Sequence, residues 1–266
     1  MDIHIYKYHG TGNDFILIDD REVTFDADTS RVKFLCDRHF GIGADGLMLL
    51  QKAEGYDFRM VYYNSDGKES SMCGNGGRCI TAFAHKLGLL SSDHASFIAT
   101  DGPHESLILS SQPGNFTVRL KMKEVNSIEF KGEYTFLNTG SPHYVRETQG
   151  LDTMDLVQEA RKIRYSDTFA PGGTNVNFIE FHDNIIHIRT YERGVEDETL
   201  SCGTGVTAAA LYAASVQPDI FISPVVVRAI GGILRVHFQK DGNRFHDVWL
   251  EGPAAFVFES NFDLSL

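Results

Sequence analysis

Two segments of the chain begin with the same motif, a cysteine followed by Gly-x-Gly. One is MCGNGGRCITAFAHKLG, which starts at Met72, and the other is SCGTGVTAAALYAASVQ, which starts at Ser201. An offset of 129 residues aligns Cys73 with Cys202 and keeps both glycines of each motif in register. Because this offset is close to half of the 266 residues, the sequence predicts a chain made of two similar halves.

Each repeated segment is rich in alanine and apolar on all sides, which is typical of a buried helix. Short runs of alternating apolar residues predict strands at 3–8, 15–18, 58–63, 116–122, 176–181, 185–191, 225–227, 233–238 and 248–250. Several runs are joined by turns too short for a parallel crossover, at 113–115, 182–184 and 240–243. We therefore expect an α+β fold in which each buried helix is the central helix of its own mostly antiparallel sheet.

The boundary between the halves is expected at the turn 112–115. It would divide the chain into residues 1–115, with Cys73, and residues 116–254, with Cys202. A boundary after 147–150 is less favoured because it divides the chain unequally.

Two further helices are predicted from capping residues. Thr29 or Ser30 is expected to cap a helix that runs to about His39. Asp152 or Thr153 is expected to cap another that runs to Arg164.

Charge and cysteine content narrow the function classes. The chain has 36 acidic and 24 basic residues, and the basic ones are scattered, which argues against nucleic acid or an anionic membrane as a partner. The longest apolar run, 206–216, is shorter than the roughly 18 residues of a membrane span. The N-terminal sequence lacks the pattern of a secretory signal, so we expect a cytoplasmic protein. Its four cysteines are then not a disulfide framework, and any with a functional role act as thiols.

The repeated motif predicts a reactive site. A helix start presents N–H groups without intrahelical partners and about half a positive charge, which stabilises a thiolate or a bound carboxylate. Two such thiols on opposite sides of a substrate suit inversion at the α-carbon of an amino acid, since one removes a proton and the other returns one. The N–H groups would stabilise the charge that develops on the carboxylate, and no pyridoxal phosphate or other cofactor is then required.

The motifs resemble those of the diaminopimelate epimerase family over essentially the whole chain. They occur in the same order and spacing as HGTGNDF (9–15), GIGADG (41–46), YNSDG (63–67), MCGNGGRC (72–79), GSPH (140–143), TNVNF (174–178), YERG (191–194) and SCGTG (201–205). The resemblance implies two pseudo-symmetric α/β halves, each a mostly antiparallel sheet or barrel wrapped around one helix, with the last strand, within 255–266, returning to the first half. It also implies cofactor-independent interconversion of LL- and meso-diaminopimelate, in lysine and peptidoglycan precursor biosynthesis, by a homodimer.

The same resemblance assigns roles to individual residues. In the LL-to-meso direction Cys202 is the proton acceptor and Cys73 the proton donor, while the residues themselves leave open which cysteine is the thiolate at rest. Arg193 suits a bidentate grip on the distal carboxylate and Glu192 suits an ammonium group. The implied substrate-binding residues are Asn13, Asn64, Gly74, Asn75, Asn175, Glu192, Arg193, Gly203 and Thr204, with Ser141 and His143 as further candidates.

Two positions depart from the family pattern. Gly46 stands where many members have glutamine, and Ser141 where many have asparagine. Both positions concern substrate positioning rather than proton transfer.

Other interpretations of these residues are structural rather than functional, or lead to other functions. Cys36 and Cys79 are expected to be structural, and the C-x₅-C spacing of Cys73 and Cys79 is not that of a zinc site, so no metal is expected. The alternative functions are a proline or hydroxyproline type racemase, a non-enzymatic amino-acid binding protein, and redox chemistry through a Cys73–Cys202 disulfide. The Glu192-Arg193 pair favours a long substrate with charge at both ends.

Overall fold

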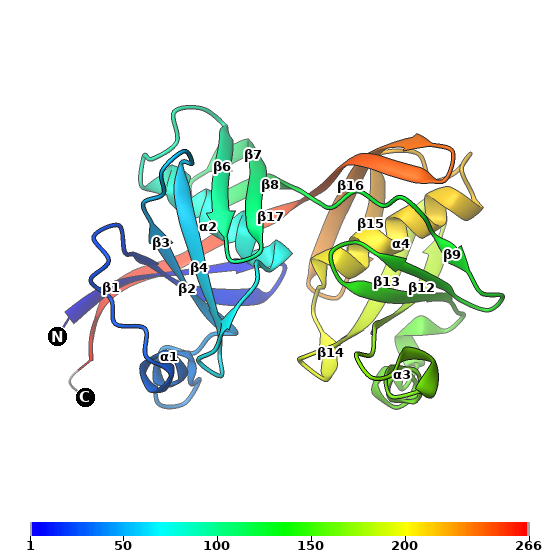
Figure 1. Cartoon of the computed structure of the whole chain (residues 1–266), viewed down its shortest axis with the longest axis horizontal. Helices are drawn as coiled ribbons and strands as arrows, with labels where there is room; N and C mark the ends of the chain where they lie inside the picture. The colour runs from blue at the N-terminus through cyan, green and yellow to red at the C-terminus, as the bar shows by residue number, and fades with distance from the viewer. Residues whose placement is uncertain (1, 265–266) are drawn as a thin grey trace. The chain divides into compact units, whose positions relative to one another are not determined.

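The computed structural model describes residues 2–264 and divides into two compact units (Figure 1). Unit 1 comprises the chain up to Leu120 and the segment from Gly252 onward, and unit 2 comprises Lys121–Glu251. Both units combine strands with helices, and each holds one of the repeated motifs at the start of a buried helix, which confirms the α+β fold class. Among the helices of residues 2–264, none has the length and apolar character needed to cross a membrane.

Unit 1 is built on the helices α1 (Thr29–Cys36) and α2 (Gly74–Lys86). Its strands are β1 (Asp2–Gly10), β2 (Asn13–Asp19), β3 (Gly46–Gln51), β4 (Phe58–Asn64), β5 (Glu69–Ser70), β6 (His94–Ala99), β7 (Gly102–Gln112), β8 (Asn115–Lys121) and the last part of β17 (Arg244–Asp263). β17 pairs with β1 and β8 in this unit, after pairing with β16 (Gly232–Asp241) in unit 2.

Helix α2 packs against one face of the unit 1 sheet and α1 against the other. Phe83 of α2 contacts the rings of Tyr6 and Tyr8 on β1. On the other face of the sheet, apolar residues of β1–β4 pack against α1 in a hydrophobic cluster that includes Ile16 and Leu47. Because both faces of the sheet are buried, β3 is a continuous apolar run without alternation, and the sequence analysis missed it.

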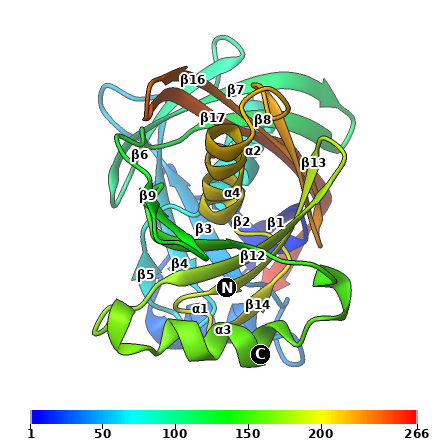
Figure 2. The ribbon, with the colours of Figure 1, turned by 90° about the vertical axis from the view of Figure 1, so that its right-hand side faces the viewer.

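Unit 2 repeats this construction with α3 (Leu156–Arg164) and α4 (Gly203–Val216). Figure 2 shows α4 enclosed by strands, with α3 outside them. The remaining elements are β9 (Glu129–Phe130), β10 (Thr135–Asn138), β11 (Pro142–Glu147), the 3₁₀ turns η1 (Leu151–Thr153) and η2 (Asp167–Phe169), β12 (Asn175–His182), β13 (Ile185–Glu192), β14 (Asp197–Thr199), β15 (Val225–Ala229), β16 and the first part of β17.

The predicted hairpins and the mostly antiparallel pairing are confirmed. The turns expected at 113–115, 182–184 and 240–243 join β7 to β8, β12 to β13 and β16 to β17. The parallel pairs among the described strands are β2–β3, β4–β6, β11–β12 and β13–β15.

The predicted caps of the two outer helices were wrong by a few residues. Asp28, not Thr29 or Ser30, caps α1 by accepting the N–H groups of Ser30 and Arg31, and α1 ends at Cys36 rather than near His39. Asp155 caps α3, while the two residues predicted for that role lie in the turn η1. Both segments contain several cap-forming residues in a row, so the sequence alone did not select among them.

Candidate active site

The two repeated cysteines have the same local structure. Cys73 is the N-cap of α2 and Cys202 the N-cap of α4, each with extended backbone, at φ −95° and −110°. The carbonyl of each cysteine accepts the first helical hydrogen bond, at 2.7 Å from Gly77 and 2.8 Å from Val206. Neither side chain caps its helix, so each sulfur remains beside the positive helix end without being consumed by the cap.

In unit 1 the predicted residues Asn13, Cys73 and Asn75 lie together. The Cys73 thiol donates to Asn13 Oδ1, with sulfur and oxygen 3.6 Å apart. Asn75 Nδ2 donates to the same oxygen at 3.2 Å. The opposite end of the Asn13 amide donates to Asp45 Oδ2 at 2.7 Å.

A buried arginine that the sequence analysis missed supports this cluster. Arg78 is fully buried, and its guanidinium donates to Asn75 Oδ1 at 2.9 Å and to the carbonyls of Gly74 and Pro253 at 3.3 Å each. Burial lowers the pKa of Arg78. A charged residue inside an otherwise apolar helical repeat was the signal that could have identified it.

Asn64 is the last residue of β4, lies opposite Gly46 of β3 in the β3–β4 register, and is exposed. At Gly46 a Cβ atom would lie 2.6 Å from the Tyr62 ring and 2.6 Å from the carbonyl oxygen of Tyr63. The Tyr62 ring therefore fills the space beside Gly46, and a glutamine would not fit this backbone. This explains the first departure from the family pattern.

In unit 2 Cys202 is almost buried, with 6% of its surface exposed. Its sulfur lies 3.4 Å from the hydroxyl of Thr204, the second residue of α4. The Thr139 hydroxyl donates to the Thr204 carbonyl at 2.8 Å and ties the helix start to the loop after β10. Cys202 thus has a hydroxyl neighbour where Cys73 has an amide oxygen.

Ser141, Asn175 and Arg193 form a second cluster in unit 2. Asn175 Nδ2 donates to Ser141 Oγ at 2.8 Å, and Asn175 Oδ1 accepts the Arg193 backbone N–H at 2.8 Å. Within residues 2–264 the hydrogen bonds of the exposed Arg193 guanidinium are long, at 3.5 Å to Ser141 Oγ and 3.4 Å to the Gly172 carbonyl. Glu192 accepts a hydrogen bond from Thr199 at 3.1 Å. The guanidinium is weakly held, so a ligand carboxylate could redirect it at small cost.

His143 is buried in a polar network beneath the start of α4. Asn177 Nδ2 lies 3.1 Å from His143 Nδ1 and donates at 2.8 Å to the Tyr144 carbonyl, while the Thr190 hydroxyl donates to Asn177 Oδ1. These bonds orient the amide so that His143 Nδ1 accepts. Burial, followed by the positive charge of Arg193, lowers the pKa of His143 to about 3, so the ring is neutral at physiological pH.

The lowered pKa of His143 predicts a pH-dependent stability. His143 takes up a proton below about pH 6.5 in the unfolded chain, but only near pH 3 in the folded chain. Proton uptake therefore favours the unfolded chain, and the free energy of unfolding falls as the pH is lowered. Between pH 7 and pH 5 the wild type should lose about 2 kcal/mol more unfolding free energy than His143→Gln. Urea unfolding at both pH values measures the difference. His39→Gln, at an exposed histidine, is the control, and equal losses in wild type and His143→Gln would contradict the prediction.

Cys36 and Cys79 have a different environment. Both are buried, and burial raises the pKa of each thiol to about 12. They therefore remain protonated at neutral pH, in keeping with the structural role expected for them.

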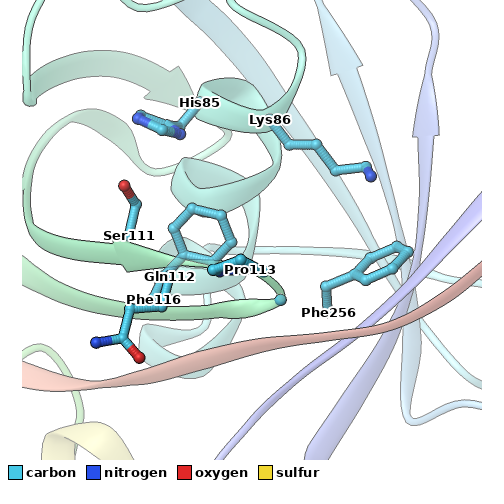
Figure 3. Close-up of a pocket in the computed structure, with 8 residues that line it drawn as sticks. His85, Lys86, Ser111, Gln112, Pro113, Phe116 and Phe256 are labelled. Carbon is cyan, nitrogen blue, oxygen red and sulfur yellow. The ribbon is translucent and has the colours of Figure 1, made fainter.

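A surface pocket of about 270 Å³ lies at the other end of α2 (Figure 3). It is lined by His85 and Lys86 of the helix, by the β7–β8 hairpin and by Phe256, whose ring lies 4.3 Å from Lys86 Nζ. His85 lies twelve positions after Cys73 along the helix, a rise of about 18 Å, so this pocket does not serve the cysteine. Within residues 2–264, no group of three or more His, Cys, Asp or Glu side chains is arranged to hold a metal ion.

The fold places the chain in a class of proteins for which solved structures are known. A phenazine biosynthesis protein of the PhzF family from Bacillus anthracis has the same fold, with a TM-score of 0.78, 16% identity and coverage of 99% of this chain and 100% of that one. A probable proline racemase from Agrobacterium radiobacter gives a TM-score of 0.69 at 15% identity, over 99% and 93% of the two chains. The chain therefore has the fold shared by these two proteins.

The sequence comparisons identify the family within that class. The family model for diaminopimelate epimerase matches residues 5–125 and 135–257, and the chain belongs to this family. It is 48% identical to the diaminopimelate epimerase of Flavobacterium psychrophilum, over 96% of this chain and 98% of the relative. This confirms the family predicted from the eight motifs.

Proposed function

We propose that the protein is an isomerase that interconverts LL- and meso-diaminopimelate, with Cys73 and Cys202 as its two acid/base groups. The observation that carries the proposal is the duplicated cysteine N-cap, in a chain 48% identical to a protein named diaminopimelate epimerase. Identity to the probable proline racemase is only 15%, which supports a common fold and not a common substrate.

The proposed reaction moves one proton at each cysteine. In the LL-to-meso direction the Cys202 thiolate takes the α-proton and becomes a thiol, while the Cys73 thiol gives its proton to the opposite face and becomes a thiolate. The negative charge that develops on the substrate spreads onto the α-carboxylate. N–H groups in the first turns of α2 and α4, including those of Gly74, Asn75, Gly203 and Thr204, would stabilise it.

We assign the distal end of the substrate to the cluster of Ser141, Asn175 and Arg193 in unit 2. Arg193, adjustable beside Asn175 and Ser141, would bind the distal carboxylate, and Glu192 the distal ammonium. In unit 1, Asn13 and Asn64 would complete the binding residues. His143, neutral and buried, would support the start of α4.

Proton NMR in D₂O tests the proposal. Reduced protein is mixed with LL-diaminopimelate without a cofactor, and the α-proton signal and the meso isomer are followed. Loss of the α-proton signal together with formation of the meso isomer is expected. Exchange only with proline or hydroxyproline would move the function to the racemase alternative, and no exchange with any of these substrates would favour a binding protein.

Arg193→Ala should raise KM for LL-diaminopimelate by about tenfold to a hundredfold, because it removes a charged hydrogen-bond donor to the distal carboxylate. Steady-state kinetics measure the change. Arg228→Ala, at an exposed arginine on β15 of the same unit, is the matched control. An unchanged KM for Arg193→Ala would remove this residue from the binding site.

The homodimer and the cytoplasmic location remain predictions. Sedimentation of the purified protein measures the first, and fractionation of the source cells measures the second.

A further inference from the structure

We propose that Asp45 is a positioning residue for Cys73: its carboxylate orients the Asn13 amide so that an oxygen, and not an NH₂ group, faces the Cys73 sulfur. The inference deepens the proposed function, on which it rests, by naming a residue that controls one of the two acid/base groups. Asp45 would touch neither the substrate nor the cysteine.

The orientation of Asn13 is fixed from both sides. A carboxylate only accepts hydrogen bonds, so the end of Asn13 that lies 2.7 Å from Asp45 must be Nδ2. On the other side, Arg78 only donates, so Asn75 presents Oδ1 to Arg78 and Nδ2 to Asn13. Oδ1 of Asn13 therefore faces both Asn75 and the Cys73 thiol.

Asp45 is itself held by charge. Arg38 Nη2 lies 2.9 Å from Asp45 Oδ1 and 2.7 Å from Asp14 Oδ1, and Asp14 pairs with Lys7 at 2.7 Å. Hydrogen bonds from Arg38 and Lys7 outweigh burial and lower the pKa of Asp14 to about 2. One oxygen of Asp45 serves Arg38 and the other serves Asn13, and an amide could not accept at both atoms.

Several backbone hydrogen bonds anchor the loop that carries Asp45, in addition to the Asp14 N–H that the Asp45 carboxylate accepts at 3.3 Å. Backbone hydrogen bonds join Ile42 and Gly43 to Leu35, Ala44 to Cys36, and the Asp45 N–H to the Asp14 carbonyl. Because the backbone anchors the loop, the side chain of Asp45 is available for a positioning role.

The expected effect concerns the protonation state of Cys73. An amide oxygen that accepts the thiol hydrogen favours the thiol over the thiolate, whereas an NH₂ group would favour the thiolate. The other charged or titratable groups around this cluster are Lys7, Asp14, Arg38, Arg78, Cys79 and Asp101. The pKa values of Asp14, about 2, and Cys79, about 12, lie outside the assay range of pH 6–10.

Alkylation of Cys73 by iodoacetamide, followed peptide by peptide as a function of pH, tests the inference without requiring activity. In Asp45→Asn the pH midpoint of Cys73 alkylation should fall by about half a unit to one unit, the size of one weak hydrogen bond. Epimerisation by the same variant should show the corresponding limb of its pH–rate profile moved to lower pH in both directions.

The matched control is Asp37→Asn. Asp37 lies in the same loop and accepts the N–H groups of His39 and Phe40, but it has no described contact with Asn13. It should lower stability and leave the alkylation midpoint unchanged. Asn13→Ala should reproduce the shift, and adding Asp45→Asn to it should shift the midpoint no further.

A wild-type midpoint in Asp45→Asn would overturn the inference, as would additive shifts in the double variant. If the midpoint moves as expected but the wild type does not epimerise diaminopimelate, the positioning role stands and the proposed function fails.

Discussion

Cys73→Ala and Cys202→Ala should each lower kcat for epimerisation by at least about a thousandfold in both directions. A positioned acid or base contributes about 10² to 10⁴ to a rate, and inversion needs both groups in every turnover. Because each cysteine is an N-cap whose side chain does not cap its helix, alanine should leave the helix start intact. Steady-state kinetics measure the loss, and circular dichroism verifies the fold.

Cys36→Ala is the control for this pair. Cys36 is buried against β3 and its thiol stays protonated at neutral pH, so the variant should keep wild-type kcat with some loss of stability. Normal turnover by either Cys73→Ala or Cys202→Ala would refute the two-thiol mechanism.

Gly205→Ala should lower kcat by about a hundredfold and destabilise unit 2 by about 1–3 kcal/mol. A Cβ at Gly205 would lie 2.4 Å from Asn177 Oδ1. Asn177 is held by hydrogen bonds with His143, Tyr144 and Thr190, so it cannot move aside, and the start of α4 must shift instead. A displacement of about 1 Å at a catalytic group costs about 10² in rate.

The repeat supplies the matched control, Gly76→Ala. A Cβ at Gly76 would lie 3.2 Å from Met48 Sδ and 3.3 Å from Met60 Cε, flexible ends that can move aside, and 3.7 Å from Cys73 Cβ, an ordinary van der Waals distance. This variant should lose much less than Gly205→Ala in both kcat, from steady-state kinetics, and unfolding free energy, from urea denaturation. Equal effects of the two substitutions would mean that the Asn177 network does not position Cys202.

The sequence predicted the parts of the fold that depend on local pattern. The cysteine motifs mark the starts of α2 and α4, because glycines and apolar residues on all sides leave few alternatives to a buried helix. β3 was missed because burial on both faces removes the alternation that identifies a strand. At Gly76 and Gly205 the absent Cβ faces side chains of the sheet, a packing requirement that the sequence pattern did not reveal.

The candidate site was predicted in part. The resemblance selected Asn13 and Asn75, which the structure brings to Cys73, and Ser141, Asn175 and Arg193, which it brings to one another. The supporting groups were not predicted. Asp45 and Asn177 act through hydrogen bonds to residues that are distant in sequence, and no local pattern records such partners. Arg78 differs, because it bonds to Asn75 and Gly74 on its own helix as well as to the distant Pro253.

The path of β17 bears on how the protein is made. Unit 2 is one continuous stretch, whereas unit 1 needs residues 252–263 to pair with β1 and β8. During synthesis unit 2 can fold first. β1 is synthesised at the start of translation, but its partner strand is synthesised near the end, so β1 stays unpaired on that side until then. The test uses ribosome-bound chains that end at residue 251, followed by a linker long enough to place residue 251 outside the exit tunnel. In these chains unit 2 should resist protease, whereas β1 should be cut. Resistance at both places would show that the early strands fold without their late partner.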